Sequence, residues 1–379
     1  MAPRRGDGAP GLIECPQRGS ISAAVVSGAT SRSDRSPGPT VCESPRGGCY
    51  DRGSHASRGA RSVRVRSWLK GIGGFLLAGL LFFVFGWAPY FLAGIATTRR
   101  FQFPDKENAG LDPKALGLAY ESVDFRASDG VELKGWWVPA EGAHGTVVLV
   151  HGLNRSRIEM VRKAPFVHEH GWNALIFDLR HHGESGGDVT TFGFKEKEDV
   201  RAAVVETRRR SPGPVVLWGV SLGGASVVMA AAQDPKVAGV ICDSSYRDLP
   251  DTVRHHVALF RSFRWWLKIV PPWPLTDQVL FWMGQRGGFD PAAVDVRGAA
   301  ALLNGRPALF VANSEDRRMP KEIAFDLQKA AGAKAEVLIV PGKSHGGAWR
   351  DGTAAYSTAV AGVLDAAQAF AGATQVAAR

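Results

Sequence analysis

The sequence predicts an α/β domain built on a mostly parallel sheet, preceded by one helix long enough to cross a membrane. Two observations carry this prediction. Beyond residue 100, short and fully apolar runs alternate with helical stretches, which is typical of a parallel sheet covered by helices on both faces. Before residue 100, the 26 residues 71–96 contain no charged side chain. At 379 residues the chain is long enough for both parts.

The first 66 residues form a basic segment rich in Gly, Ser, Arg and Pro, without helical or strand periodicity. A segment of this composition cannot bury a core, so we expect 1–66 to be disordered. The alternative is that the true start of translation lies downstream and that this segment is a mis-assigned extension.

Residues 67–98 are predicted to be a single-pass transmembrane anchor, because the uncharged stretch exceeds the ~20 residues that a bilayer requires. Trp68, Trp87 and Tyr90 suit the two membrane interfaces. More basic residues precede the span than follow it, which predicts a cytoplasmic N-terminus and a catalytic domain on the exported side. The alternative is a signal peptide cleaved near Ala96. The apolar stretch is, however, about twice as long as the apolar region of a signal peptide, which favours an uncleaved anchor.

The charge of the chain argues against a nucleic-acid partner. The formal net charge is +10, but residues 1–100 account for 14 basic and 5 acidic residues of the totals of 46 and 36. Residues 101–379 therefore hold 32 basic and 31 acidic residues, and this balance gives no basic face. Cys242 is the single cysteine of this part of the sequence, so we expect no disulfide within it. His168 and His170 lie two residues apart on a predicted helix and therefore point to different faces, so we expect no metal site there. No cofactor is expected.

The elements of the domain follow in order along residues 101–379. A turn at 128–130 joins the first two strands as an antiparallel hairpin. The predicted strands are 122–126, 133–138, 146–150, 174–177, 215–218, 237–241, 308–311 and 336–340. The predicted helices are 157–170, 195–209, 222–233, 320–331 and 353–370.

Residues 246–300 interrupt this alternation and are interpreted as an inserted helical cap. Four tryptophans fall in this segment: Trp265, Trp266, Trp273 and Trp282. We expect them to form the core of the cap. Lining of the substrate pocket and contact with the nearby bilayer are the alternatives.

The pentapeptide Gly-x-Ser-x-Gly occurs three times, around Ser185, Ser221 and Ser344. A nucleophile on a strained strand-to-helix turn requires a buried strand directly before it and a helix directly after it. Ser221 alone meets this requirement, with the apolar run 215–218 before it and the helical stretch 222–233 after it. Ser185 is separated from its strand, and only the adjacent histidine follows Ser344. Ser221 is therefore the predicted nucleophile.

A general base and an acid are expected further along the chain, each on a loop after a strand, in the order Ser, acid, His. His345 follows the last predicted strand and can take the proton of Ser221. Asp316 follows the strand before it and would orient the imidazole. Glu315 and Asp243 are the alternatives for the acid. The oxyanion hole is predicted from the backbone N–H groups of two leucines, Leu222 after the nucleophile and Leu153 after the strand 146–150.

In order, the segments VVLVHGLNRSR, FDLRHHGES, GVSLGG, CDSSY, NSEDRRMP and PGKSHG resemble the α/β-hydrolase superfamily, in particular its serine-aminopeptidase-like and BEM46-like branch. The resemblance covers about residues 118–370. It implies an eight-stranded sheet and a triad of Ser221, Asp316 and His345. One departure is visible, because the usual Arg-Gly-His-Gly reads Arg180-His181-His182-Gly183 here.

These observations predict a membrane-anchored serine hydrolase that cleaves a carboxylic ester or thioester, with a small-molecule ester or acyl compound as substrate. A serine aminopeptidase is the first alternative and would need an acidic group, Asp251 or Asp277, to hold an α-amine. An inactive, membrane-tethered binding protein is the second. The oligomeric state does not follow from the sequence.

Overall fold

The computed structural model describes residues 56–100, 102, 108–263, 265, 268 and 271–377. The expectation of disorder for 1–66 lies outside the described residues for 1–55 and is wrong for 56–66, which form the beginning of a helix. By its contacts the chain divides into two units, 1–65 and 66–379. What is described of the first unit is the beginning of one helix, α1 (Ala56–Phe82), and the second unit contains all the strands.

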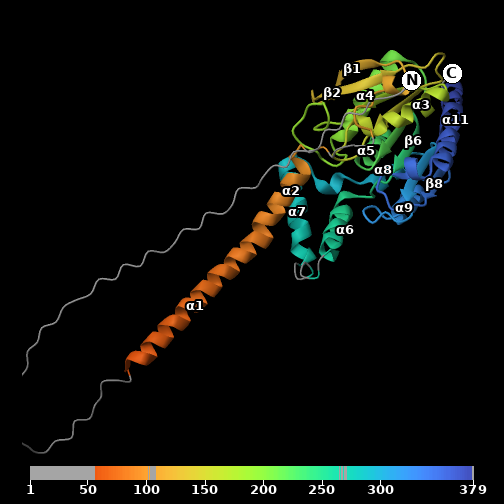
Figure 1. Cartoon of the computed structure of the whole chain (residues 1–379). Helices are drawn as coiled ribbons and strands as arrows, with labels where there is room; N and C mark the ends of the chain where they lie inside the picture. The colour runs from red at the N-terminus through yellow and green to blue at the C-terminus, as the bar shows by residue number, and fades with distance from the viewer. Residues whose placement is uncertain are drawn as a thin grey trace, which may run out of the picture. The chain divides into compact units, whose positions relative to one another are not determined.

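The domain is built on an eight-stranded sheet with the order β1-β2-β4-β3-β5-β6-β7-β8 (Figure 1). Strands β1 and β2 pair antiparallel with each other, β2 pairs antiparallel with β4, and all other pairs are parallel. The strands are β1 (Glu121–Arg126), β2 (Glu132–Val138), β3 (Thr146–Val150), β4 (Asn173–Phe177), β5 (Val215–Val220), β6 (Val237–Asp243), β7 (Ala308–Asn313) and β8 (Ala335–Val340). The predicted fold class and each predicted strand are confirmed, with ends that differ by at most two residues.

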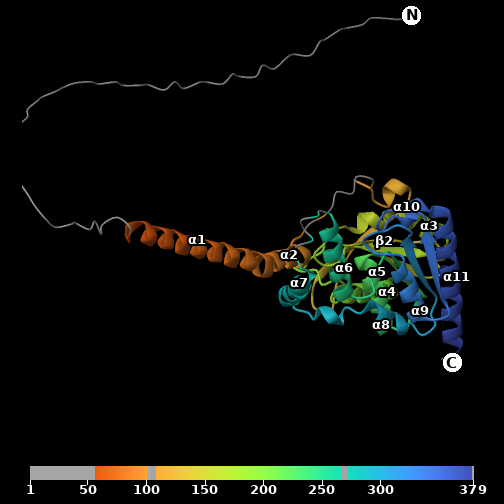
Figure 2. The same cartoon turned by 90° about the horizontal axis from the view of Figure 1, so that it is seen from below.

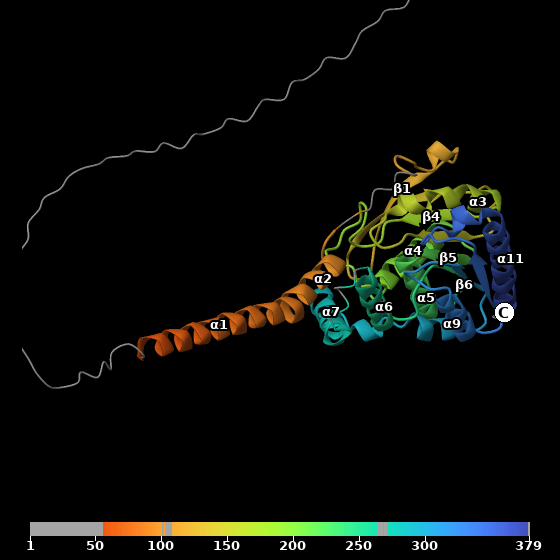
Figure 3. The same ribbon diagram turned by 60° about the horizontal axis from the view of Figure 1, so that its bottom comes forward.

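Helices cover both faces of this sheet, as the alternation of the sequence predicts (Figures 2 and 3). One face packs against η3 (Arg157–Lys163), α3 (Ala164–Glu169), α10 (Ala348–Asp351) and α11 (Thr353–Ala377). The other face packs against α4 (Glu196–Arg210), α5 (Leu222–Gln233), α8 (Val296–Ala301) and α9 (Glu322–Ala331). Two separate apolar cores therefore lie on opposite sides of the sheet.

The expected single helix 157–170 is wrong in detail, because it divides into a 3₁₀ stretch, η3, and a short α-helix, α3. Pro165 occupies the first turn of α3. Proline has no backbone N–H and is tolerated only in the first turn of an α-helix, so the regular helix begins there rather than at Arg157.

The apolar N-terminal segment continues from α1 through a π-helical turn, η1 (Phe83–Trp87), into α2 (Ala88–Thr97). Residues 66–97 are long and apolar enough to cross a membrane. Their environment changes along the helix: the side chains of 66–83 are exposed, whereas Pro89, Ala93 and Thr97 are buried. The Thr97 carbonyl also accepts a hydrogen bond from the N–H of Thr190. The end of the predicted anchor is thus packed into the domain.

Residues 246–300 are helical, as predicted. They form α6 (Leu249–Ser262), α7 (Pro272–Gly287), η5 (Pro291–Ala293) and α8. The expectation that the tryptophans form the core of this segment is wrong for Trp265 and Trp273, which are 81% and 73% exposed. Two helices joined by a short connection enclose no interior at the connecting end, so side chains there cannot be covered. Trp282 packs edge-on against Tyr90 of α2, with 5.1 Å between ring centroids. Trp266 lies outside the described residues.

Candidate active site

Ser221 occupies a tight turn between β5 and α5, with φ of 54° and ψ of −113°. A positive φ is unfavourable for any residue with a side chain, and this strained turn places the hydroxyl beyond the carboxyl edge of the sheet. The turn can close only because its flanking residues are glycines. A Cβ at Gly219 would lie 2.2 Å from the Gly223 carbonyl oxygen, and a Cβ at Gly223 would lie 2.4 Å from that of Val150. The repeated glycines are therefore required by backbone contacts.

The structure brings together the side chains of Ser221, Asp316 and His345. The His345 Nε2 lies 2.9 Å from the Ser221 Oγ, and the His345 Nδ1 lies 2.7 Å from the Asp316 Oδ2. The second oxygen of Asp316, Oδ1, accepts hydrogen bonds from the backbone N–H groups of Arg318 (2.8 Å) and Met319 (3.2 Å). With Oδ1 fixed in this way, Oδ2 is held facing the imidazole. These are the contacts that a hydroxyl nucleophile, its base and an orienting acid require.

The two alternative acids occupy other environments. Asp243 is fully buried at the end of β6, where its carboxylate accepts hydrogen bonds from the Ser244 hydroxyl (2.8 Å) and the Tyr356 hydroxyl (3.1 Å). Burial raises the pKa of Asp243. Glu315 lies on the surface, 3.6 Å from the Lys343 ammonium. Neither carboxylate is hydrogen-bonded to His345, so the geometry favours Asp316.

The two rejected serines make structural contacts. The buried Ser185 hydroxyl donates to the Asp178 carbonyl and accepts from the N–H of Lys134. The Ser344 hydroxyl accepts a hydrogen bond from Arg350 on the surface.

The loop after β3 lies beside Ser221, as the predicted oxyanion hole requires. A Cβ at Gly152 would be 3.5 Å from the Ser221 Cβ. Among the described residues, no hydrogen-bond partner is found for the backbone N–H of Leu153 or for that of Leu222. Both donors are therefore available to a ligand. Leu222 is also the first residue of α5, where the helix dipole favours negative charge.

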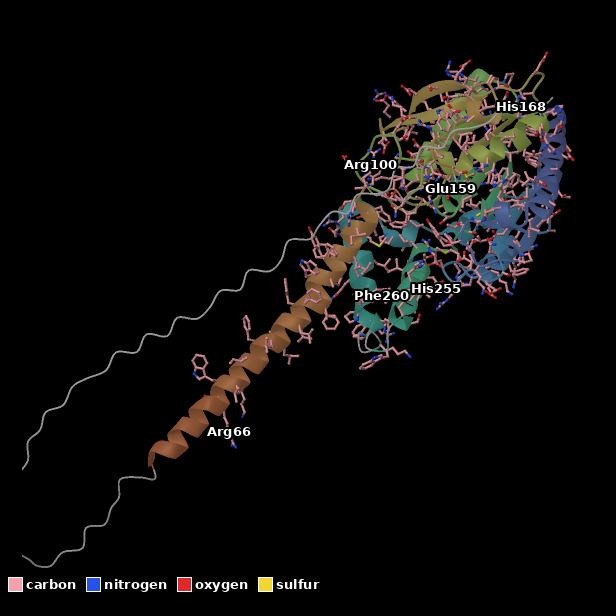
Figure 4. The ribbon with its side chains drawn as sticks, in the orientation of Figure 1. Arg66, Arg100, Glu159, His168, His255 and Phe260 are labelled. Atoms are coloured by element: carbon pink, nitrogen blue, oxygen red, sulfur yellow. The ribbon has the colours of Figure 1, made fainter. Side chains whose placement is uncertain are left out.

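Two side chains that sequence reasoning missed hold this loop in place. The carboxylate of Glu159, a residue that Figure 4 labels, accepts a hydrogen bond from the N–H of Gly152; the two atoms are 2.7 Å apart. The buried His151 ring donates from Nδ1 to the Gly152 carbonyl and accepts the N–H of Leu179 at Nε2. Burial lowers the pKa of His151 to about 4, so the ring is neutral. No local pattern in the sequence distinguishes these residues, because their partners belong to other elements.

A buried lysine beneath the site was also missed. Lys163 is 4% exposed, and its ammonium lies 5.6 Å from the ring centroid of Trp218 and 5.9 Å from that of Trp349. Burial lowers the pKa of Lys163, while the negative charge of Asp243 opposes this shift. Trp218 donates a hydrogen bond to the Tyr356 hydroxyl, which in turn contacts Asp243. These side chains form a polar layer below the turn that carries Ser221.

An open recess of about 670 Å³ lies on the outer side of the acid and the base. Its lining is charged and comprises Glu315, Asp316, Arg317, Arg318, Lys343 and His345. Helix α6 reaches the same loop, because His255 Nε2 lies 2.8 Å from the Arg317 carbonyl oxygen (Figure 4). The loop after β7, which carries Asp316, is thus in direct contact with the first helix of the 246–300 segment.

Comparison with known proteins agrees with this architecture. Residues 147–359, more than half of the chain, match the model of the alpha/beta hydrolase family. The chain is 26% identical over 224 residues to the uncharacterised protein YqkD of Bacillus subtilis, which covers 56% of this chain and 69% of that protein. It is 34% identical over 128 residues to the thiohydrolase aneE of Aspergillus aculeatus, covering 32% of this chain but only 40% of that one.

A solved esterase structure from Pyrococcus furiosus superposes with a TM-score of 0.57 at 22% identity and covers 71% of this chain and 98% of its own. A likeness at this level of identity concerns the fold. Together with the family match and the strand-turn-helix geometry around Ser221, it leads to one conclusion: the chain belongs to the alpha/beta hydrolase family.

Proposed function

We propose that this protein is a membrane-anchored serine hydrolase that cleaves a carboxylic ester or thioester through an acyl-enzyme on Ser221. The observation that carries this proposal is the unbroken series of contacts from Ser221 Oγ to His345 Nε2 and from His345 Nδ1 to Asp316 Oδ2. The names of an esterase and a thiohydrolase among the similar proteins support the ester and thioester classes.

In the proposed reaction, His345 removes the proton of the Ser221 hydroxyl as the oxygen attacks the carbonyl carbon. The N–H groups of Leu222 and Leu153 stabilise the negative charge on the carbonyl oxygen of the tetrahedral intermediate. The imidazolium then gives its proton to the leaving alkoxide or thiolate, and an acyl-enzyme remains. A water molecule activated by His345 attacks the acyl-enzyme, releases the carboxylic acid and restores the Ser221 hydroxyl.

A fluorophosphonate probe tests the nucleophile directly. The wild-type chain should be labelled, and Ser221→Ala should not. Ser344→Ala is the matched control, because it removes a serine from the same pentapeptide pattern and should be labelled like the wild type. Equal labelling of Ser221→Ala and the wild type would refute the proposal. A panel of p-nitrophenyl esters and thioesters of increasing acyl length would then define the substrate.

The proposed anchor is the helix formed by residues 66–97, with the domain on the exported side. Trp68 and Trp87 lie 19 residues apart, which corresponds to about 28 Å of helix and is close to the ~30 Å of the hydrocarbon core. The packing of α2 into the domain favours an uncleaved anchor, because cleavage near Ala96 would remove the buried Ala93. Digestion of intact cells by an external protease tests the exported topology: protection of the domain after the outer barrier is opened would contradict it.

The aminopeptidase alternative finds no support in the two candidate acids. Asp251 is 2.9 Å from the Arg247 guanidinium, which neutralises it, and Asp277 is exposed on α7. Neither contacts the recess beside His345.

A further inference from the structure

The connecting end of the α6–α7 hairpin carries large apolar side chains that are exposed. Phe260 is 57% exposed, Phe263 59%, Trp265 81% and Trp273 73%. Figure 4 shows Phe260 near this end of α6, with His255 farther along the helix toward the sheet. We name these four residues the aromatic end. Large exposed aromatic side chains gathered at one end of a hairpin indicate a surface that binds a partner or a membrane.

The charge around the aromatic end is predominantly positive, and the first acidic residue after it in the sequence is Asp277 of α7. Between Thr252 and Thr276 the sequence contains four basic residues and no acidic residue. Those that the structure describes include Arg261, which donates to the Lys268 carbonyl at the connecting end itself. Aromatic side chains combined with Lys and Arg are typical of segments that lie in a membrane interface.

The contacts between α7 and α2 place this end relative to the proposed anchor. Trp282 of α7 packs against Tyr90 of α2. Four residues further along each helix, Arg286 lies over Gly94, and a Cβ added to Gly94 would be 3.2 Å from the guanidinium carbon of Arg286. Arg286 also donates to the Thr98 hydroxyl at 3.0 Å. The two helices therefore contact each other along α2 and run in the same sense there, and α7 diverges from the line of α1 toward its connecting end (Figure 1).

The contacts of α7 place the hairpin at the proposed membrane interface. Besides α2, helix α7 contacts η1, which ends at Trp87, the residue expected at this interface. The connecting end of the hairpin lies on the side of the domain from which the anchor approaches (Figure 1). Interfacial segments bury their apolar face about 5–10 Å into the boundary between headgroups and acyl chains, a depth that the end of a hairpin at this level can reach.

We infer that the aromatic end of the α6–α7 hairpin inserts into the bilayer beside the anchor, and that the enzyme takes its acyl substrate from this lipid phase. The inference rests on the proposed anchor and on the proposed esterase or thioesterase activity. Helix α6 connects the inserted end to the loop of Asp316 through the contact between His255 and the Arg317 carbonyl. The hairpin therefore extends from the lipid to the edge of the active site, and an amphiphilic ester is the substrate class that fits this route.

Site-specific fluorescence in vesicles tests the insertion with the full chain. Cys15, Cys42 and Cys49 are replaced by Ser, and the buried Cys242 remains. An environment-sensitive fluorophore is then attached to one of three single cysteines, Trp265→Cys, Phe75→Cys or Ala355→Cys. The vesicles contain anionic phospholipid and a phospholipid with a nitroxide quencher on its acyl chain.

Phe75 lies within the anchor, and Ala355 is exposed on α11, so these positions report lipid and water. We expect the reporters at 265 and 75 to lose at least about half of their emission and the reporter at 355 to lose none. Quenching at 75 without quenching at 265 would overturn the insertion and leave the anchor intact. Absence of quenching at 75 would overturn the proposed anchor. If the reporter at 265 were quenched and the reporter at 75 were not, the insertion of the hairpin would be supported and the anchor would be overturned.

The substrate route has its own test. Trp265→Ser combined with Trp273→Ser should lower the hydrolysis of a long-chain ester embedded in vesicles by about ten-fold, because the hairpin loses the two exposed aromatic side chains that would insert into the bilayer. Hydrolysis of water-soluble p-nitrophenyl acetate should not change, which shows that Ser221 still functions. Leu302→Ser, which removes another exposed apolar side chain in the turn after α8, is the control and should alter neither rate. An equal loss with both substrates, or no loss with either, would overturn the route.

Discussion

The two oxygens of Asp316 make different contacts, and this predicts the effect of Asp316→Asn. Oδ1 accepts two backbone N–H groups, from Arg318 and Met319. An asparagine must keep its carbonyl oxygen there, because its NH₂ group would otherwise face two donors. The NH₂ group therefore faces His345 Nδ1, and the imidazole must accept a hydrogen bond at Nδ1 and carry its proton on Nε2. A protonated Nε2 cannot take the proton of Ser221.

The expected loss is about 10,000-fold in kcat, the scale found when a triad acid becomes an amide, which corresponds to about 5.5 kcal/mol of activation free energy. Hydrolysis of p-nitrophenyl butyrate by the purified full chain measures it. The midpoint of thermal unfolding should change little, since the contacts to Oδ1 remain. Glu315→Gln is the matched control, because this adjacent carboxylate is exposed and pairs with Lys343 on the surface, and the variant should retain activity. If Asp316→Asn kept more than about a tenth of the wild-type kcat, the assignment of Asp316 as the orienting acid would be refuted.

Three further predictions concern stability. Gly223→Ala places a Cβ 2.4 Å from the Val150 carbonyl oxygen and should lower the free energy of unfolding, measured in urea, by about 1–3 kcal/mol. Gly372→Ala is the control, because a Cβ there lies in open space on α11, and it should not destabilise the fold. Equal effects of the two substitutions would contradict the argument from close backbone approach. Asp199→Ala removes the buried one of the two carboxylates that bind the Arg180 guanidinium and leaves the half-exposed Asp129. It should lower the free energy of unfolding by about 2–3 kcal/mol, and a loss below about 1 kcal/mol would show that this pair is dispensable. Burial lowers the pKa of both His151 and His182 to about 4 from 6.5. The unfolded chain therefore binds more protons than the folded one below pH 6.5, so the free energy of unfolding should fall by about 2 kcal/mol per histidine between pH 7 and pH 5, and constant stability over this interval would contradict neutral histidines.

The sequence was sufficient to predict the strand, the turn and the helix around Ser221, because this turn depends on residues that are neighbours along the chain. A buried strand, two glycines and a helix are all within ten residues of the nucleophile. The choice between Asp316, Glu315 and Asp243 was different. This choice depends on which carboxylate is held facing His345. The hydrogen bonds that decide it are those from the backbone N–H groups of Arg318 and Met319 to Asp316.

Apolar patterns could not show what covers a hydrophobic surface. Residues 88–97 were interpreted as part of the membrane span, yet Ala93 is buried by protein, since burial in lipid and burial against α7 favour the same side chains. Trp265 and Trp273 were assigned to a core for the converse reason: tryptophan is usually buried, and only the arrangement of α6 and α7 shows that these two are exposed. Glu159 and Lys163 were missed because a single charged residue in an amphipathic helix usually faces solvent.

The continuity of η1 with α2 has a consequence for how the enzyme meets its substrate. No loop separates the apolar helix from the first residues that pack into the domain. In a bilayer, the domain would turn with this helix instead of moving freely on a linker. Diffusion would then be confined to two dimensions with the hairpin always facing the lipid, so that substrates in the same membrane are met at a high effective concentration. A water-soluble ester gains nothing from this confinement.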